Sequence, residues 1–187
     1  MEGRHRLFGA LTALAFSACY VTILLGGNVM ASGSGLACPS WPTCFGSQVL
    51  PPDTGAAGIE SAHRLGAFVL SLFVLAVVVG AVLWERSRQA VLRLSIASGA
   101  AVIVQALLGA VVVESGLAVG VVLLHFALAT VLFLLLLVLA LVANLRFLPR
   151  RWRQWVVEAG AEAPADPYRV IDGEPAPARP GPTPGRA

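Results

Sequence analysis

The sequence predicts an all-α integral membrane protein built as a four-helix bundle. Hydrophobic residues make up 57% of the 187 residues and charged residues only 12%, a composition outside the range of soluble globular domains. Four uncharged runs are each long enough to cross about 30 Å of hydrocarbon, which takes roughly 20 residues of helix. In lipid, only an α-helix or a closed β-barrel satisfies all of its backbone hydrogen bonds. None of the runs shows the alternation of a barrel strand, so each is expected to be a helix.

The first predicted helix follows Arg4 and Arg6 near the start of the chain. Such a start also occurs in cleaved signal peptides, but the run is long and has no small-x-small cleavage site, which favours a retained helix. Glycines within the helices (Gly26, Gly27, Gly66 and Gly109) are expected at close-packing positions. The four predicted helices cover roughly 7–27, 59–84, 92–113 and 117–145.

The arginines predict the orientation of these helices. They supply all 13 basic side chains, and the loop at 28–58 contains none of them. Because basic residues stay on the cytoplasmic side, both termini are expected in the cytoplasm and this loop outside. The net charge of +3 therefore reflects topology, and no nucleic-acid partner is expected. The deciding arginines are Arg4, Arg6, Arg86, Arg88, Arg93, Arg146, Arg150, Arg151 and Arg153.

The chain is expected to divide into three parts. Residues 1–6 are expected to form a cytoplasmic N-terminus, and residues 7–145 a transmembrane domain whose extracytoplasmic loop is 28–58. Residues 146–187 begin with Arg and Trp side chains that suit the membrane interface. They continue with seven prolines from Pro164 to Pro184, a composition typical of a disordered cytoplasmic tail.

Two cysteines, Cys38 and Cys44, lie in a Gly/Pro-rich stretch of the outer loop. In an oxidising compartment a close pair of this kind can persist as a disulfide. It could staple the loop or exchange electrons with a partner, although the spacing is not the C-x-x-C of exchange enzymes. Cys19, within the first helix, is expected to be a small buried apolar residue.

Ionisable residues inside membrane helices are costly and usually functional. His63 lies near the outer end of the second predicted helix, and His125 lies about 9 Å below the outer start of the fourth, at roughly 1.5 Å per residue. At this similar depth the two imidazoles suit axial coordination of a haem iron inside the bundle. The alternative for each histidine is an interhelical hydrogen bond, while zinc would require more ligands.

Three polar residues accompany the histidines. Glu60 precedes His63 by three positions, on the same helical face, and could reach the edge of a bound macrocycle for proton transfer or charge stabilisation. Arg64 could pair with haem propionates, or it could form only an i, i+4 pair with Glu60. Gln105, in the third helix, is expected either to link helices by hydrogen bonds or to act directly at the bound group.

Four segments of the chain occur in a distinctive order and spacing: "GGNVMASGSGLACPSWPTCFG", "IESAHRLGAF", "QALLGAVVV" and "LLHFALA". From about Leu7 to Leu145 they resemble the N-terminal half of haem A synthase, the membrane enzyme of cytochrome oxidase biogenesis. The resemblance implies oxidation of the C8 methyl group of haem O to a formyl group, giving haem A for cytochrome c oxidase assembly. It also implies a multi-pass protein of a prokaryotic plasma membrane.

The resemblance assigns roles to individual residues. His63 and His125 correspond to the family's axial ligands of the substrate haem iron, Glu60 to its essential glutamate, and Cys38 and Cys44 to its loop disulfide. The familiar enzyme has eight helices, and its second half binds haem b. A four-helix chain is therefore expected either to form a homo-oligomer, with haem b in a partner subunit, or to work differently.

Further partners implied by the resemblance are haem O synthase and an electron acceptor. The loop also departs from the family, which often has a basic residue at Met30 and an acidic one at Ser40. Three rival functions remain open at the level of sequence: a bis-histidine b-type cytochrome that only passes electrons, a four-helix membrane thiol oxidoreductase, and a structural accessory subunit.

Overall fold

The computed structural model describes residues 2–46 and 54–147, and the elements found there are helices. The long helices confirm the predicted all-α fold, and each is apolar and long enough to cross a membrane. Residues 148–187, nearly all of the predicted interfacial segment and tail at 146–187, and residues 47–53 of the loop lie outside the described residues. The elements are α1 (Glu2–Ala31), α2 (Gly55–Trp84), α3 (Gln89–Glu114), α4 (Val119–Asn144) and the 3-10 turn η1 (Leu145–Phe147).

Helices α1 and α2 begin earlier in the chain than the apolar runs. Helix α1 starts at Glu2 and takes in Arg4 and Arg6, and α2 starts at Gly55. Hydropathy marks the part of a helix that lipid surrounds, whereas the backbone hydrogen bonds can continue into the polar interface beyond it. The difference between prediction and structure is thus confined to helix ends.

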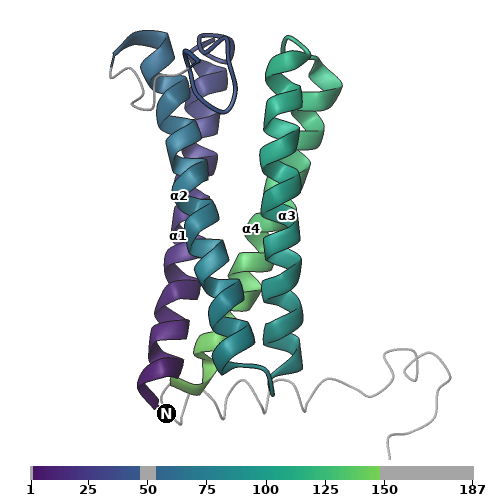
Figure 1. Cartoon of the computed structure of the whole chain (residues 1–187). Helices are drawn as coiled ribbons and strands as arrows, with labels where there is room; N and C mark the ends of the chain where they lie inside the picture. The colour runs from purple at the N-terminus through teal and green to yellow at the C-terminus, as the bar shows by residue number, and fades with distance from the viewer. Residues whose placement is uncertain (1, 47–53, 148–187) are drawn as a thin grey trace, which may run out of the picture. The chain divides into compact units, whose positions relative to one another are not determined.

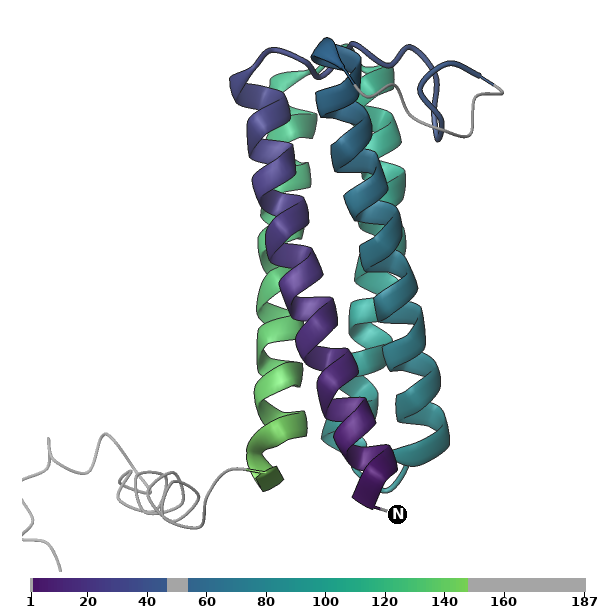
Figure 2. The same ribbon diagram turned by 90° about the vertical axis from the view of Figure 1, so that its left-hand side faces the viewer.

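The helices are packed in a ring (Figures 1 and 2). Helix α1 packs against α2 and α4, and α3 packs against α2 and α4. Helices α2 and α4 therefore face each other across the centre of the ring. The loop after α1 and the turn between α3 and α4 lie at the same end of the bundle, called here the loop end (Figure 1).

The bundle is packed most densely away from the loop end. Phe8 of α1 is fully buried, and a Cβ added at Gly80 of α2 would lie 3.1 Å from its ring, so this glycine lets the two helices approach closely. Outward side chains are apolar and exposed, as lipid-facing surfaces require. The buried core consists of Phe8, Ala15, Cys19, Leu70, Val74, Val77, Ala81, Val91, Leu132, Leu136, Leu139 and Ala143.

A buried carboxylate links three segments of the chain at the end of the bundle opposite the loop. Glu85, which follows α2, is fully buried and lies 2.6 Å from Nδ1 of His5 on α1. Arg88 donates to the Glu85 carboxylate at 3.3 Å and to the carbonyl of Val142 on α4 at 2.8 Å. These bonds join three segments of the chain and satisfy the polar groups that burial would otherwise penalise.

Candidate functional site

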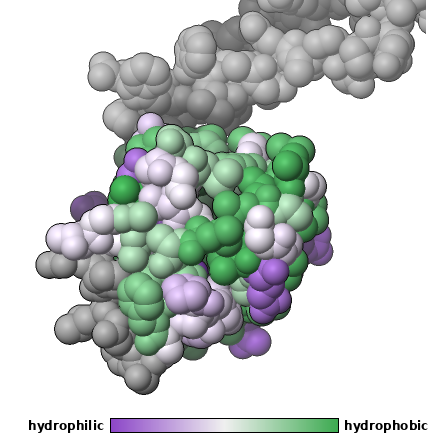
Figure 3. Space-filling model, turned by 90° about the horizontal axis from the view of Figure 1, so that it is seen from above, coloured by the Kyte–Doolittle hydropathy of each residue, from purple (hydrophilic) through white to green (hydrophobic). Residues whose placement is uncertain are grey.

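A cavity of about 650 Å³ lies between the helices in the half of the bundle nearer the loop. Its volume falls within the range of roughly 300 to 1,000 Å³ in which cofactor and small-molecule sites occur. Most of its lining is apolar, and apolar or weakly polar residues also cover most of the surface at the loop end (Figure 3). The polar side chains that line it are Thr22, Thr43, Glu60, Ser61, His63, Arg64, Ser71, Gln105 and His125.

His63 enters this cavity from α2 with its orientation set by α1. Nδ1 of His63 lies 3.1 Å from the carbonyl oxygen of Thr22, which can only accept, so Nδ1 carries the proton. Nε2 then keeps its lone pair, the state in which an imidazole binds a metal. A Cβ at Gly26 would lie 2.9 Å from Cε1 of the ring, so the absence of a side chain there makes room for His63.

His125 enters the same cavity from α4, and α3 holds it. The side-chain amide of Gln105 donates to the carbonyl of His125 at 3.1 Å and lies 3.3 Å from Nε2 of its ring. Nδ1 of His125 and Oε1 of Gln105 are buried polar atoms without a hydrogen-bond partner among the described residues. Buried polar atoms of this kind are rare in folded proteins, so both atoms are candidates to contact a bound group.

The two histidines fit a haem better than a protein-held metal ion. They reach one cavity from helices that face each other across the ring. Within residues 2–46 and 54–147, no three His, Cys, Asp or Glu side chains gather as ligands for a metal ion. An iron that brings its own four porphyrin nitrogens needs only two further ligands, which two imidazoles in an apolar bundle could supply.

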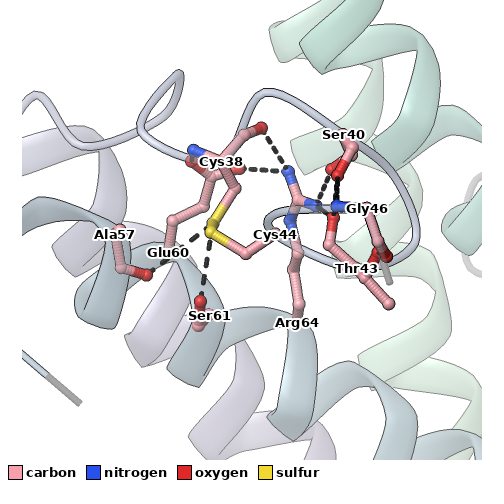
Figure 4. The surroundings of a disulfide bond; sticks show 9 residues. All are labelled: Cys38, Ser40, Thr43, Cys44, Gly46, Ala57, Glu60, Ser61 and Arg64. Carbon is pink, nitrogen blue, oxygen red and sulfur yellow. Dashed lines mark hydrogen bonds and ion pairs between the residues drawn. A yellow bond between two sulfur atoms is a disulfide. The ribbon is translucent and has the colours of Figure 1, made fainter. Parts of the chain in front are cut away.

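Glu60 and Arg64 lie at the rim of the cavity and hold the outer loop (Figure 4). Glu60 is buried, and its carboxylate accepts a hydrogen bond from the backbone N–H of Cys38 at 2.8 Å and forms an ion pair with Arg64 at 2.5 Å. The i, i+4 pair considered from the sequence is therefore present. Its contact with the loop backbone gives Glu60 a second role that helix spacing alone could not indicate.

Arg64 fixes the same loop through its carbonyl groups (Figure 4). The guanidinium donates to the carbonyl of Cys38 at 3.1 Å, to that of Thr43 at 2.9 Å, and also to that of Ser40. The planar guanidinium offers five donors in a fixed arrangement, which suits several carbonyls at once. These contacts are with protein groups, so the expected pairing of Arg64 with propionates stays a prediction.

Cys38 and Cys44 form a disulfide with their Cα atoms 4.3 Å apart. The Cys38 sulfur lies 3.4 Å from the hydroxyl of Ser61, so the disulfide rests on α2 (Figure 4). Trp41 and Cys44 line the cavity. The stapled loop thus covers the cavity at the loop end.

Some lining residues gave no signal in the sequence. Leu117, in the turn between α3 and α4, has a positive φ of 63° and lines the cavity. A Cβ at Gly35 of the outer loop would lie 3.1 Å from the Leu117 side chain. This contact links the α3–α4 turn to the loop. The left-handed backbone of Leu117 costs roughly 1 kcal/mol, and only its tertiary setting could have identified it.

No family model matches this chain. Several curated proteins do, and each of those named here is called haem A synthase. The protein of Bacillus pumilus is 35% identical over 147 residues, which are 75% of this chain and 45% of that protein. The protein of Bacillus licheniformis is 32% identical over 139 residues, 71% of this chain and 43% of that protein. The protein of Symbiobacterium thermophilum is 39% identical over 82 residues, 44% of this chain and 24% of that protein. The chain therefore spans less than half the length of each of these curated relatives.

Proposed function

Because this chain is a multi-pass membrane homologue of the haem A synthases, an oxidoreductase family, over part of their length, we propose that it is itself a haem A synthase. In this proposal it oxidises the C8 methyl group of haem O to the formyl group of haem A. The observation that carries the proposal is the placement of His63 and His125, from facing helices, in one cavity with a buried carboxylate at its rim.

The chain's own residues would hold and orient haem O. Nε2 of His63 is free to bind the iron because Thr22 fixes the proton on Nδ1. His125 would supply the second ligand, while Gln105 sets the position of its backbone through the 3.1 Å bond to its carbonyl. The apolar lining would surround most of the macrocycle, and the stapled loop covers the cavity at the loop end.

Glu60 is proposed as the residue that assists the oxidation. Converting a methyl to a formyl group takes up one oxygen atom, here from water, and releases four protons and four electrons, so a nearby carboxylate can accept a proton or stabilise developing positive charge. Glu60 lines the cavity and is only 3% exposed, which strengthens its electrostatic effect. The electrons would pass to an acceptor or to haem b in a partner subunit of a homo-oligomer, with haem O synthase supplying the substrate.

The orientation belongs to the same proposal. The loop end would face the outside of a prokaryotic plasma membrane, with both termini in the cytoplasm, because Arg86, Arg88 and Arg93 lie at the opposite end. An oxidising exterior also favours the Cys38–Cys44 disulfide. A membrane-impermeant label on a cysteine placed at Ser32, which is exposed directly after α1, should react in intact cells; reaction only after lysis would reverse this orientation.

The test is to purify the protein from cells supplied with haem O, record its reduced spectrum and separate the extracted haems by chromatography. We expect both haem O and haem A on the wild-type protein. Glu60→Gln should keep bound haem O while haem A falls below detection, and Glu114→Gln, at an exposed position, should behave as wild type. A colourless wild-type protein would exclude the proposal.

A bis-histidine cytochrome that only passes electrons is the second candidate. The observation in its favour is that both carboxylate oxygens of Glu60 already bind protein groups, Cys38 and Arg64. Such a protein would bind haem and undergo reduction, but no haem A would form, and Glu60→Gln would leave its reduction rate unchanged. The haem extraction described above separates the two candidates.

A further inference from the structure

The cavity is incompletely closed on its side. Several residues that line it have large exposed fractions, and the two most exposed large side chains among them are on α2: Phe68 is 61% exposed and Leu65 is 51% exposed. On α3, Ala106 lines the cavity and is exposed as well. A residue that contacts both the interior and the surroundings marks an opening between them.

The opening lies between α2 and α3. Further from the loop end these helices are in contact: a Cβ at Gly99 of α3 would lie 3.0 Å from the Val78 side chain of α2. Ala106 follows Gly99 by seven residues and Ser71 precedes Val78 by seven, which in each helix is about two turns along the same face. Ala106 and Ser71 both line the cavity, so the contacting faces separate towards the loop end.

The other side of α3 is closed by contrast. Gln105 bonds to His125 on α4, and a Cβ at Gly109 would lie 3.4 Å from the His125 ring. Gln105 and Gly109 therefore face α4, and Ala106 lies on the edge of the cavity-lining face nearer α2. Because the side chain of Ala106 is small, it does not narrow the opening. Phe68 forms an apolar wall on the α2 side.

The opening lies at the depth of the hydrocarbon. Phe68 is roughly 20 Å along α2 from Gly55, and Ala106 is about 12 Å along α3 from Glu114, at 1.5 Å per residue. The spans cross about 30 Å of hydrocarbon. At this depth the opening contacts acyl chains, so a group that occupies it must be apolar.

We propose that the opening between α2 and α3 holds the isoprenoid side chain of haem O. The macrocycle would lie in the cavity between the histidines, and its long hydrocarbon tail would extend past Phe68 and Ala106 into the membrane. The inference rests on the proposed function and adds a specificity determinant to it. It predicts that the protein distinguishes haem O from haem b, which lacks this tail.

The experiment titrates the purified full-length protein in lipid nanodiscs with haem O and separately with haem b, following the absorbance of the bound haem. Wild type should bind haem O more tightly. Ala106→Phe, which narrows the opening, should weaken haem O binding by about tenfold, the loss expected when roughly two methylene groups give up their apolar contact. Its affinity for haem b should fall clearly less than its affinity for haem O, because haem b has no tail in the opening.

Leu107→Phe is the matched control. Leu107 is the neighbouring residue on α3, is 57% exposed and does not belong to the described lining of the cavity. A phenylalanine there should change neither affinity. If Ala106→Phe does not fold, Phe68→Ala, which removes the apolar wall, should also weaken haem O binding selectively.

Equal affinities of wild type for the two haems, or an equal loss for both in Ala106→Phe, would overturn the tail assignment and leave haem binding intact. Failure of wild type to bind either haem would instead overturn the proposed function, and the tail assignment with it.

Discussion

Replacing Gly26 by alanine should weaken haem binding through His63. The new Cβ would lie 2.9 Å from Cε1 and 3.3 Å from Nδ1 of the His63 ring, closer than carbon atoms normally approach. Without haem the ring can swing into the cavity to relieve this contact. A ring bound to iron cannot move away, so the strain appears when haem binds.

The size of the effect follows from two competing responses. Holding the ring in place against an extra methyl group costs about 1 to 3 kcal/mol, and displacing it breaks the 3.1 Å bond between Nδ1 and Thr22, which costs about 0.5 to 1.5 kcal/mol. The haem-free protein can take the smaller cost, whereas the haem-bound protein has to take the larger one, so the loss of affinity is the difference. We expect a loss of roughly 0.5 to 1.5 kcal/mol, or about 2- to 12-fold in haem affinity.

The chain supplies its own control for this substitution. A Cβ at Gly27 would meet no atom within 4 Å, so Gly27→Ala carries the same helix-propensity change without the contact. Haem titration followed by absorbance measures both variants, with Gly109→Ala as an intermediate case because its Cβ would lie 3.4 Å from the His125 ring. Equal affinities for Gly26→Ala and Gly27→Ala would refute the positioning of His63 by α1.

Further substitutions test the rest of the bundle. Replacing both Cys38 and Cys44 by alanine opens a small loop worth about 2 kcal/mol of chain entropy and should increase protease cleavage of the outer loop, with the helical circular dichroism unchanged; cleavage at the wild-type rate would argue against the staple. Glu85→Ala leaves Arg88 and His5 without their buried carboxylate. The free energy of unfolding should fall by about 3 kcal/mol, which lowers the melting temperature. Haem affinity at the other end of the bundle should stay the same. Gln105→Leu removes the bond to the His125 carbonyl and should shift the haem reduction potential while haem stays bound; an unchanged potential would leave Gln105 only a packing role.

Much of this architecture could be predicted from the sequence because lipid allows few alternatives. Apolar runs located all four helices. Both His63 and His125, predicted at similar depth, line one cavity, while their role as haem ligands stays a prediction. The cysteine pair formed the expected disulfide. These features depend on local pattern and on distance along a helix, which a sequence carries directly.

The contacts of Glu60 and Arg64 could not be predicted in the same way. Helix spacing put both near the macrocycle, whereas the structure also gives them the backbone of the outer loop as a partner. That partnership depends on how a Gly/Pro-rich loop folds back, which has no periodic signal. The prediction that the helix glycines lie at close-packing positions held only in part. Gly26 and Gly66 lie against neighbouring helices, but Gly27 does not.

The ring order of the helices has a consequence for biogenesis. His63 belongs to α2 and His125 to α4, the last long helix of the described chain to leave the ribosome. Until α4 has entered the bilayer, a nascent chain presents only one of the two cavity imidazoles, and one bond to the iron would hold a porphyrin weakly. If the proposed function holds, capture of the pigment should therefore follow the insertion of α4, and an arrested intermediate ending after α3 should stay colourless.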